Sequence, residues 1–207
     1  MTDIQVMRGL KPLYDRSLIF TRLGYDKSRT ELSPDFKQEV DRLLKLTENT
    51  LDITTAYRTV DIQSIHSPHI TLEDGTILSG VRLAELMEGC DQALVMLATG
   101  GRKIMELING LQQENRMSEA IVVDAAASEM TDSALDMVMA RATALMRSRG
   151  RALTTSRFSP GYGDFDITQQ VDFYRLLEAE AFDITLNEAC LLIPEKSVFA
   201  IAGIGRQ

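Results

Sequence analysis

The sequence of 207 residues has no tryptophan, only two cysteines and two histidines, and no long hydrophobic run. The longest apolar stretches, residues 93–98 and 189–193, are far too short to cross a bilayer. The N-terminal segment lacks the apolar stretch and the small-residue cleavage site of a secretory signal. We therefore expect no membrane-spanning segment and no membrane partner, and we expect the protein to be cytoplasmic.

The scarcity of cysteine and histidine also limits metal chemistry. His66 and His69 are separated by a Ser-Pro pair, and no cysteine or HExxH pattern joins them, so we expect no metal site. A disulfide between Cys90 and Cys190 is possible, but two reduced thiols fit a cytosolic protein better. The Walker loop, the GxSxG elbow and the GxGxxG fingerprint are all missing. The sequence thus predicts no catalytic residue.

The charge balance is acidic, with 22 Lys and Arg against 30 Asp and Glu and a net charge of −8. Proteins that bind nucleic acid normally present a basic face, so we expect no nucleic-acid partner. Arg147, Arg149, Arg151 and Arg157 form one local exception. They are either cations that a helix C-terminus favours, or a docking patch for an anionic ligand or an acidic protein.

Apolar periodicity and turn residues predict the secondary structure. Helices are expected at about residues 34–51 after the N-cap Ser33, 81–87 after Ser79, 102–111, 118–149 and 168–177. Extended segments are expected at about 57–62, 70–78 with a turn at Asp74-Gly75, 93–98, 151–158, 191–193 and 198–204. Helices and strands do not alternate strictly. We predict one α+β domain over residues 1–207, with packed helices and a mixed, largely antiparallel sheet.

The most unusual segment is the loop RFSPGYG at residues 157–163. Gly161 and Gly163 allow positive φ and a close approach to a ligand, and Pro160 stiffens the chain. Arg157 offers a planar fork for a carboxylate or phosphate, and Tyr162 offers a ring and a hydroxyl. The loop could hold an amino acid joined to a nucleoside. It could equally be an ordinary strand-to-helix loop with a surface arginine.

Three strings, RFSPGYGDF, TQQVDFYRLL and NEACLLIPEKSVFAIAGI, resemble the activation domain of cobalamin (vitamin B12)-dependent methionine synthase, above all its stand-alone form. The Arg-x-x-x-Gly-Tyr signature of that family stands here as Arg157, Gly161 and Tyr162. A second signature, a Thr-Glu-Ser-like strand followed by a proline turn and Ser-Val, reads Asn187, Glu188 and Ala189, then Pro194, Ser197 and Val198. We expect residues 66–204 to form the family-like core, with residues 1–65 as a poorly matched N-terminal part.

The resemblance implies that S-adenosylmethionine binds in this loop. The arginine of the signature holds the amino-acid carboxylate, the loop backbone holds adenine, and an acid of the preceding long helix fixes the ligand. Asp132 is the expected acid, with Glu129 and Asp136 as alternatives one turn away. The expected ligand-binding residues are Arg157, Ser159, Gly161, Tyr162, Gly163, Asp132 and Glu188. Asn187 and Ala189 depart from the family's threonine and serine, and its tyrosines after the last strand have no counterpart in this sequence.

The resemblance also implies a function. The chain would be a component of a cobalamin-dependent methyltransferase system that supports reductive methylation of Co(II) cobalamin. The implied partners are a cobalamin-binding methionine synthase, which carries the cobalamin, and a one-electron donor such as flavodoxin or ferredoxin. Two alternatives remain open. The chain could reactivate another corrinoid methyltransferase, or it could be a non-enzymatic interaction protein with a degenerate ligand site.

Overall fold

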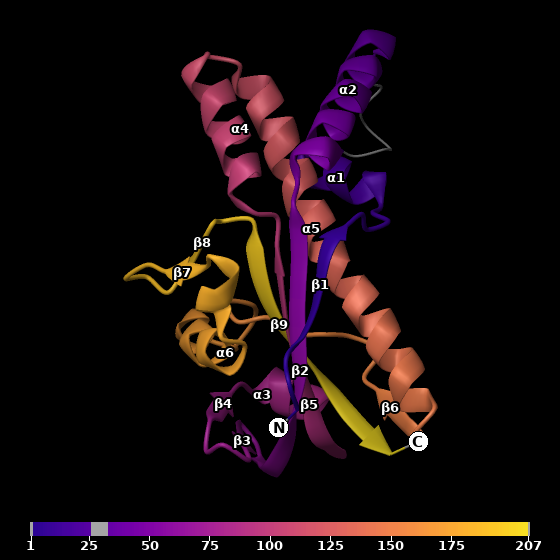
Figure 1. Cartoon of the computed structure of the whole chain (residues 1–207), viewed down its shortest axis with the longest axis vertical. Helices are drawn as coiled ribbons and strands as arrows, with labels where there is room; N and C mark the ends of the chain where they lie inside the picture. The colour runs from indigo at the N-terminus through magenta and orange to yellow at the C-terminus, as the bar shows by residue number, and fades with distance from the viewer. Residues whose placement is uncertain (1, 26–32, 207) are drawn as a thin grey trace.

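A computed structural model describes residues 2–25 and 33–206 of the chain. A strongly curved antiparallel sheet runs through the molecule, and helices pack on both of its faces (Figure 1). Its seven strands are β1 (Gln5–Leu10), β2 (Ile53–His66), β3 (His69–Leu72), β4 (Ile77–Ser79), β5 (Cys90–Thr99), β6 (Arg151–Leu153) and β9 (Ser197–Arg206). They lie in the order β4-β3-β2-β5-β9-β6, with β1 also paired to β2.

A separate two-stranded sheet is formed by β7 (Thr185–Leu186) and β8 (Leu192–Ile193). The helices are α1 (Arg16–Arg22), α2 (Pro34–Thr50), α3 (Val81–Leu86), α4 (Arg102–Gln113), α5 (Met117–Arg147) and α6 (Gln170–Leu176), with short 3-10 helices η1 (Ile167–Gln169) and η2 (Ala179–Phe182). This arrangement confirms the predicted α+β class with a largely antiparallel sheet.

The central strand β5 is buried on both faces, which explains its unbroken apolar sequence. Leu94 and Met96 point to the core shared with α2, α4 and α5, whereas Val95 and Leu97 point to the core shared with α3 and α6. This alternation follows the two-residue period of a strand. The sheet therefore separates two hydrophobic cores, and each holds a different set of helices in place.

The long helix α5 lies along one face of the sheet (Figure 1). Its core-facing positions are mostly small, and Ala126, Ala127 and Ala134 have no exposed surface. Small side chains let the helix approach β2, β5 and β9 closely. The 31 residues of α5 consequently form a rigid wall that runs from α1 and α2 to β6.

Several local predictions were wrong. Ser79 lies in β4 and does not cap α3; the Asp164 carboxylate instead accepts hydrogen bonds from the Val81 and Arg82 amides, 2.5 and 3.3 Å away. A sequence pattern cannot reveal a cap that comes from 80 residues along the chain. Residues 151–158 form a strand only as far as Leu153, followed by an isolated bridge between Phe158 and Ile201. Strand β1 and helix α1 were not predicted.

The four clustered arginines do not form one patch. Arg147 lies in the last turn of α5, as the helix-terminus interpretation predicts. Arg151 pairs with Asp91, and Arg157 turns back to pair with α5. The structure thus gives no support to a docking patch made of all four arginines, because Arg151 and Arg157 pair with different acids within the fold.

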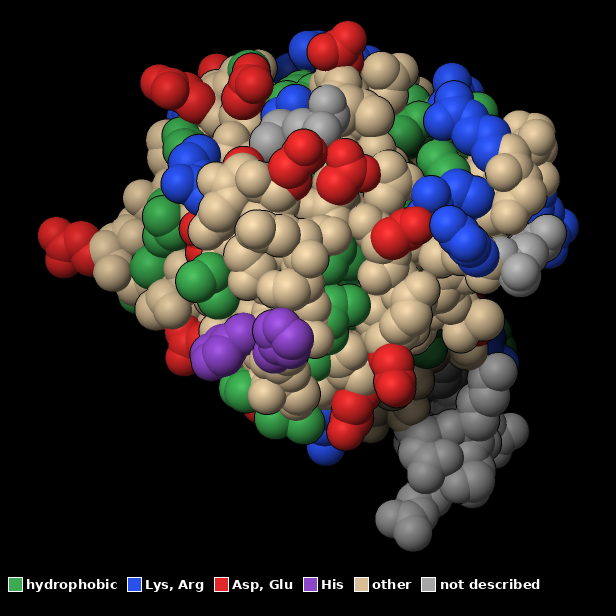
Figure 2. Space-filling view, turned by 90° about the horizontal axis from the view of Figure 1, so that it is seen from below, with side chains coloured by type: hydrophobic (Ala, Val, Ile, Leu, Met, Phe, Trp, Pro, Cys, Tyr) green, Lys and Arg blue, Asp and Glu red, His purple; other side chains and the backbone are tan. Residues whose placement is uncertain are grey.

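The two cysteines are partly buried, and the two histidines are exposed. Cys90 and Cys190 are both free thiols, and burial raises the pKa of the Cys90 thiol. His66 and His69 face each other across the β2–β3 turn and lie side by side on the surface (Figure 2).

Over residues 2–25 and 33–206, no three His, Cys, Asp or Glu side chains come together as metal ligands. In the same part of the chain, no helix has the length and apolar character needed to cross a membrane.

A pair of glycine variants tests this packing. A Cβ on Gly203 in β9 would overlap Cys90 Sγ and lie 2.9 Å from Thr154 Cγ2, so Gly203→Ala should destabilise the fold by about 1–3 kcal/mol. Gly110 in α4 has open space around it, so Gly110→Ala should stabilise the fold by about 0.5–1 kcal/mol. Urea unfolding followed by circular dichroism measures both changes. Equal stability of the two variants would contradict the described packing of β9.

Candidate functional site

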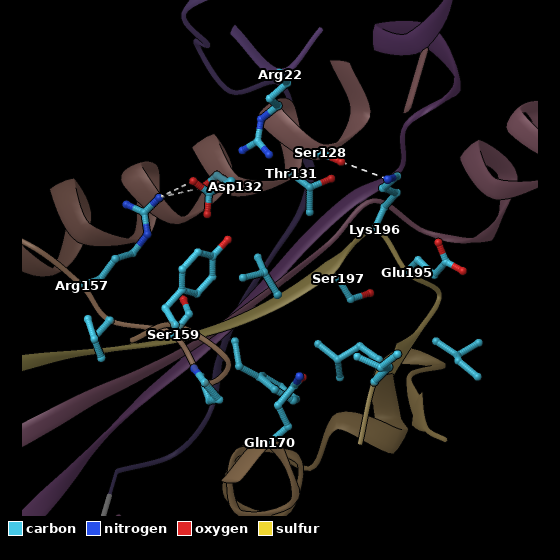
Figure 3. Close-up of a pocket in the computed structure, with 18 of the residues that line it drawn as sticks. Arg22, Ser128, Thr131, Asp132, Arg157, Ser159, Gln170, Glu195, Lys196 and Ser197 are labelled. Atoms are coloured by element: carbon cyan, nitrogen blue, oxygen red, sulfur yellow. Dashed lines mark hydrogen bonds and ion pairs between the residues drawn. The ribbon is translucent and has the colours of Figure 1, made fainter. Parts of the chain in front are cut away.

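A cleft of about 1030 Å³ lies between the middle of α5, the loop that follows β6, and the start of β9 (Figure 3). Helix α5 contributes Ser128, Thr131 and Asp132 to one wall, while α6 contributes Gln170 to the opposite wall. The remaining lining comes from residues 155–160, Tyr162, Arg22, Asn187, residues 191–193 and residues 195–199. The loop singled out in the sequence therefore forms one end of the cleft.

Arg157 ties this loop to α5. Its Nη2 group donates to the backbone carbonyl of Asp132 at 3.2 Å and to Asp132 Oδ2 at 3.0 Å, and its Nη1 group donates to Asp136 Oδ1. A guanidinium has five N–H groups, so these three hydrogen bonds leave two N–H groups without a partner among the described residues. The side chain is only 19% exposed, which holds the fork in a defined orientation.

The Arg157–Asp132 ion pair places a positive and a negative charge side by side on the cleft wall. The Asp132 side chain is 43% exposed, and its carboxylate can accept from another donor. A cation and an anion held side by side match the carboxylate and ammonium of an amino acid, and hydrogen bonds between charged groups are the strong ones. This end of the cleft is suited to a zwitterion.

The two alternative acids lie elsewhere. Glu129 is buried, and its Oε2 accepts a hydrogen bond from Arg22 Nε at 3.0 Å, which ties α1 to α5. Asp136 is more exposed than Asp132, and it meets Arg157 without lining the cleft. Among these three acids, only Asp132 lines the cleft.

Four phenylalanine side chains pack together and hold the loop of residues 157–163 against α6 and β9. The rings of Phe158, Phe165, Phe173 and Phe199 lie in a row, with neighbouring centroids 5.8–6.0 Å apart. Such pairs stabilise the loop beyond the area they bury. Tyr162 points away from this row and remains 67% exposed. Burial of the phenylalanines thus fixes the loop while leaving the tyrosine ring free at the mouth of the cleft.

The expected ligand-binding residues divide into two groups. Arg157, Ser159, Tyr162 and Asp132 line the cleft. Gly161 and Gly163 do not line it, but they have φ values of 94° and 58° and shape the turn that carries Tyr162.

Glu188 also lies outside the cleft lining, exposed on the turn between β7 and β8. Its neighbour Asn187 organises that turn, because the Asn187 side-chain oxygen accepts hydrogen bonds from the Ala189 and Leu191 amides. The position of Glu188 gives no support to a ligand contact.

The polar residues of the cleft that sequence reasoning missed include Lys196 and Gln170. Lys196 lies in the predicted proline turn, and its side chain is only 9% exposed. Its Nζ lies 2.7 Å from Asp124 Oδ1 and 2.9 Å from Ser128 Oγ on α5. Gln170 was placed on the predicted helix 168–177, but no pattern in the sequence indicates that its side chain faces a cleft.

No protein-family model matches the chain, and no curated protein matches it. Among solved structures, the chain is similar to the crystal structure of the MetH reactivation domain bound to AdoHcy. The TM-score is 0.68 at 15% identity, and the match covers 97% of this chain and 78% of that chain. At this identity the likeness shows the fold, and it confirms the activation-domain fold that the sequence resemblance predicted.

The buried lysine provides a test of the cleft wall. Asp124→Asn should destabilise the protein by about 2 kcal/mol, because it removes the negative charge beside the buried Lys196 ammonium. The cost stays below that of a fully buried pair because Asp124 is half-exposed. Lys196→Met should restore stability in the double variant, as measured by urea unfolding. A double variant less stable than Asp124→Asn would contradict the described pairing.

Proposed function

We propose that this protein binds S-adenosylmethionine in the cleft and acts as the reactivation component of a cobalamin-dependent methionine synthase in the cytoplasm. The observation that carries the proposal is the Arg157–Asp132 pair, with N–H groups to spare, on the wall of a large cleft. It occurs in a chain with the fold of a domain that was solved with AdoHcy.

The amino-acid end of the ligand fits this wall. Its carboxylate can accept the two N–H groups of Arg157 that have no protein partner, and its ammonium can donate to Asp132. Each hydrogen bond to a charged group contributes roughly 1.5–3 kcal/mol. Tyr162 offers an aromatic face at the mouth of the cleft, and a ring face attracts a cationic group such as a sulfonium.

The chemistry comes from the ligand, and the protein positions it. In methyl transfer from a sulfonium, the carbon–sulfur bond breaks, the electron pair stays on sulfur and S-adenosylhomocysteine remains. The cobalamin of the partner, reduced by one electron from a donor such as flavodoxin or ferredoxin, supplies the acceptor of the methyl group. Arg157, Asp132 and Tyr162 hold the donor in line for that transfer, and positioning alone accounts for large rate effects.

The rim of the cleft also suits a protein partner. Tyr162, Leu191 and Ile193 line the cleft and are 67%, 50% and 44% exposed. Exposed apolar side chains that gather beside a cleft are typical of an interaction surface. A partner docked on this rim would cover the cleft and bring its corrin close to the ligand.

Ligand binding is the first test of the proposal. Isothermal titration with S-adenosylmethionine should show binding by the parent protein and at least about a tenfold loss of affinity for Arg157→Ala, because the carboxylate loses its charged donors. Arg149→Ala, an exposed arginine beyond the end of α5, is the matched control and should bind like the parent. Equal affinities of parent and Arg157→Ala would contradict the proposed clamp.

The partner requires a separate assay. With S-adenosylmethionine and a one-electron donor, the protein should restore activity to a corrinoid methionine synthase that lacks its own activation domain, as followed by corrinoid absorbance. Tyr162→Ala should slow this step even where calorimetry shows retained binding, because a small misplacement of the methyl group costs much of the rate. An unchanged spectrum with every corrinoid partner of the same cell, despite demonstrated binding, would make the protein a sensor or scaffold instead.

A further inference from the structure

Two polar side chains that line the cleft, Thr131 and Gln170, have a buried oxygen without a hydrogen-bond partner in the described part of the chain. Gln170 is only 7% exposed, and its Oε1 is sealed from solvent without a hydrogen bond. Buried amide groups are nearly always hydrogen-bonded, so an unsatisfied acceptor at a cleft wall is a candidate contact for a bound molecule. The side chain belongs to the cleft wall and projects from α6 toward α5 (Figure 3).

The neighbouring glutamine shows what a structural role looks like at this place. Gln169 accepts a hydrogen bond from the Ser79 amide at 2.6 Å and donates to the Ser79 carbonyl at 2.8 Å. These two bonds fasten the start of α6 to the end of β4. Gln170 Oε1 makes no such bond to the described residues. Its amide carries both a donor and an acceptor for a bound molecule.

The surroundings of Gln170 suit a flat heterocycle. The charged pair Arg157–Asp132 lies at the α5 side of the cleft, whereas Gln170 lies across from it on α6 (Figure 3). The lining between Gln170 and the start of β9 includes Leu192 and Phe199, which are apolar. A neutral amide among apolar groups does not favour a charged ligand group. It suits a base whose edge carries a donor beside an acceptor.

We propose that Gln170 recognises the N6 amine and the N7 atom of the adenine base, in addition to the loop backbone that the family resemblance implies, and so sets specificity for the adenosyl group. This inference rests on the proposed function, since it requires a nucleoside ligand in the cleft. A glutamine amide pairs with this edge of adenine in a bidentate manner, with Oε1 accepting from N6 and Nε2 donating to N7. Hypoxanthine carries an oxygen acceptor at that position beside N7, and the glutamine amide cannot satisfy two acceptors at once.

The test compares AdoHcy with S-inosylhomocysteine, in which the 6-amine is replaced by oxygen. By calorimetry, the parent protein should prefer AdoHcy by at least about tenfold, since a good bidentate pair discriminates by about that factor or more. Gln170→Met keeps the length of the side chain and removes the amide, so the preference should fall to about one. Exposed Val171 lies next in the chain, and Val171→Ala is the matched control that should keep the parent's preference.

The possible outcomes are distinct. If Gln170→Met still prefers AdoHcy over S-inosylhomocysteine, the assignment is overturned. If Gln170→Met loses affinity equally for both ligands, the side chain has a packing role and the assignment is also overturned. If circular dichroism shows that Gln170→Met does not fold, Gln170→Leu is used as the variant that lacks the amide. Failure of the parent protein to bind AdoHcy at all would instead remove the proposed function and this inference with it.

Discussion

The cleft depends on the hydrogen-bonded ion pairs between Arg157 and α5. The loop after β6 has few backbone hydrogen bonds to the sheet, and Arg157 anchors it to Asp132 and Asp136 from one side. The phenylalanine row that includes Phe158 and Phe165 anchors it from the other. Because Arg157 is mostly buried, its guanidinium would be costly without these acids, so the loop and helix stay together. The same contact that positions the loop also places opposite charges beside the cleft.

The distribution of polar groups in the cleft indicates what it can do. Charged groups line the α5 side, and an unpartnered neutral amide lies on the α6 side. The amide is near apolar side chains, and the rim carries exposed apolar residues. This division suits a ligand with a zwitterionic end and a flat polar base. It also suits a protein that holds a reactive molecule for a partner, which is a task of positioning.

Much of this fold could be read from local sequence patterns, and the failures have physical reasons. Periodicity revealed α2 and α5 because each buries an apolar face, and a continuous apolar run revealed β5 because it is buried on both faces. Strand β1, by contrast, is an edge strand with no fully buried residue, so it leaves no such pattern. Arg157 and Tyr162 were found because a glycine-rich loop with one arginine is unusual. Lys196 and Gln170 were missed because their burial depends on α5 and the sheet, which are distant in sequence.

The crystal structure of the protein with AdoHcy bound would test the central claim most directly. The account predicts the ligand in the cleft, with its carboxylate on the N–H groups of Arg157 and its ammonium on Asp132. It further predicts the N6 and N7 edge of adenine on the Gln170 amide, whose Oε1 has no partner in the protein. A ligand bound elsewhere, or one bound in the cleft with Arg157 contacting only α5, would contradict it.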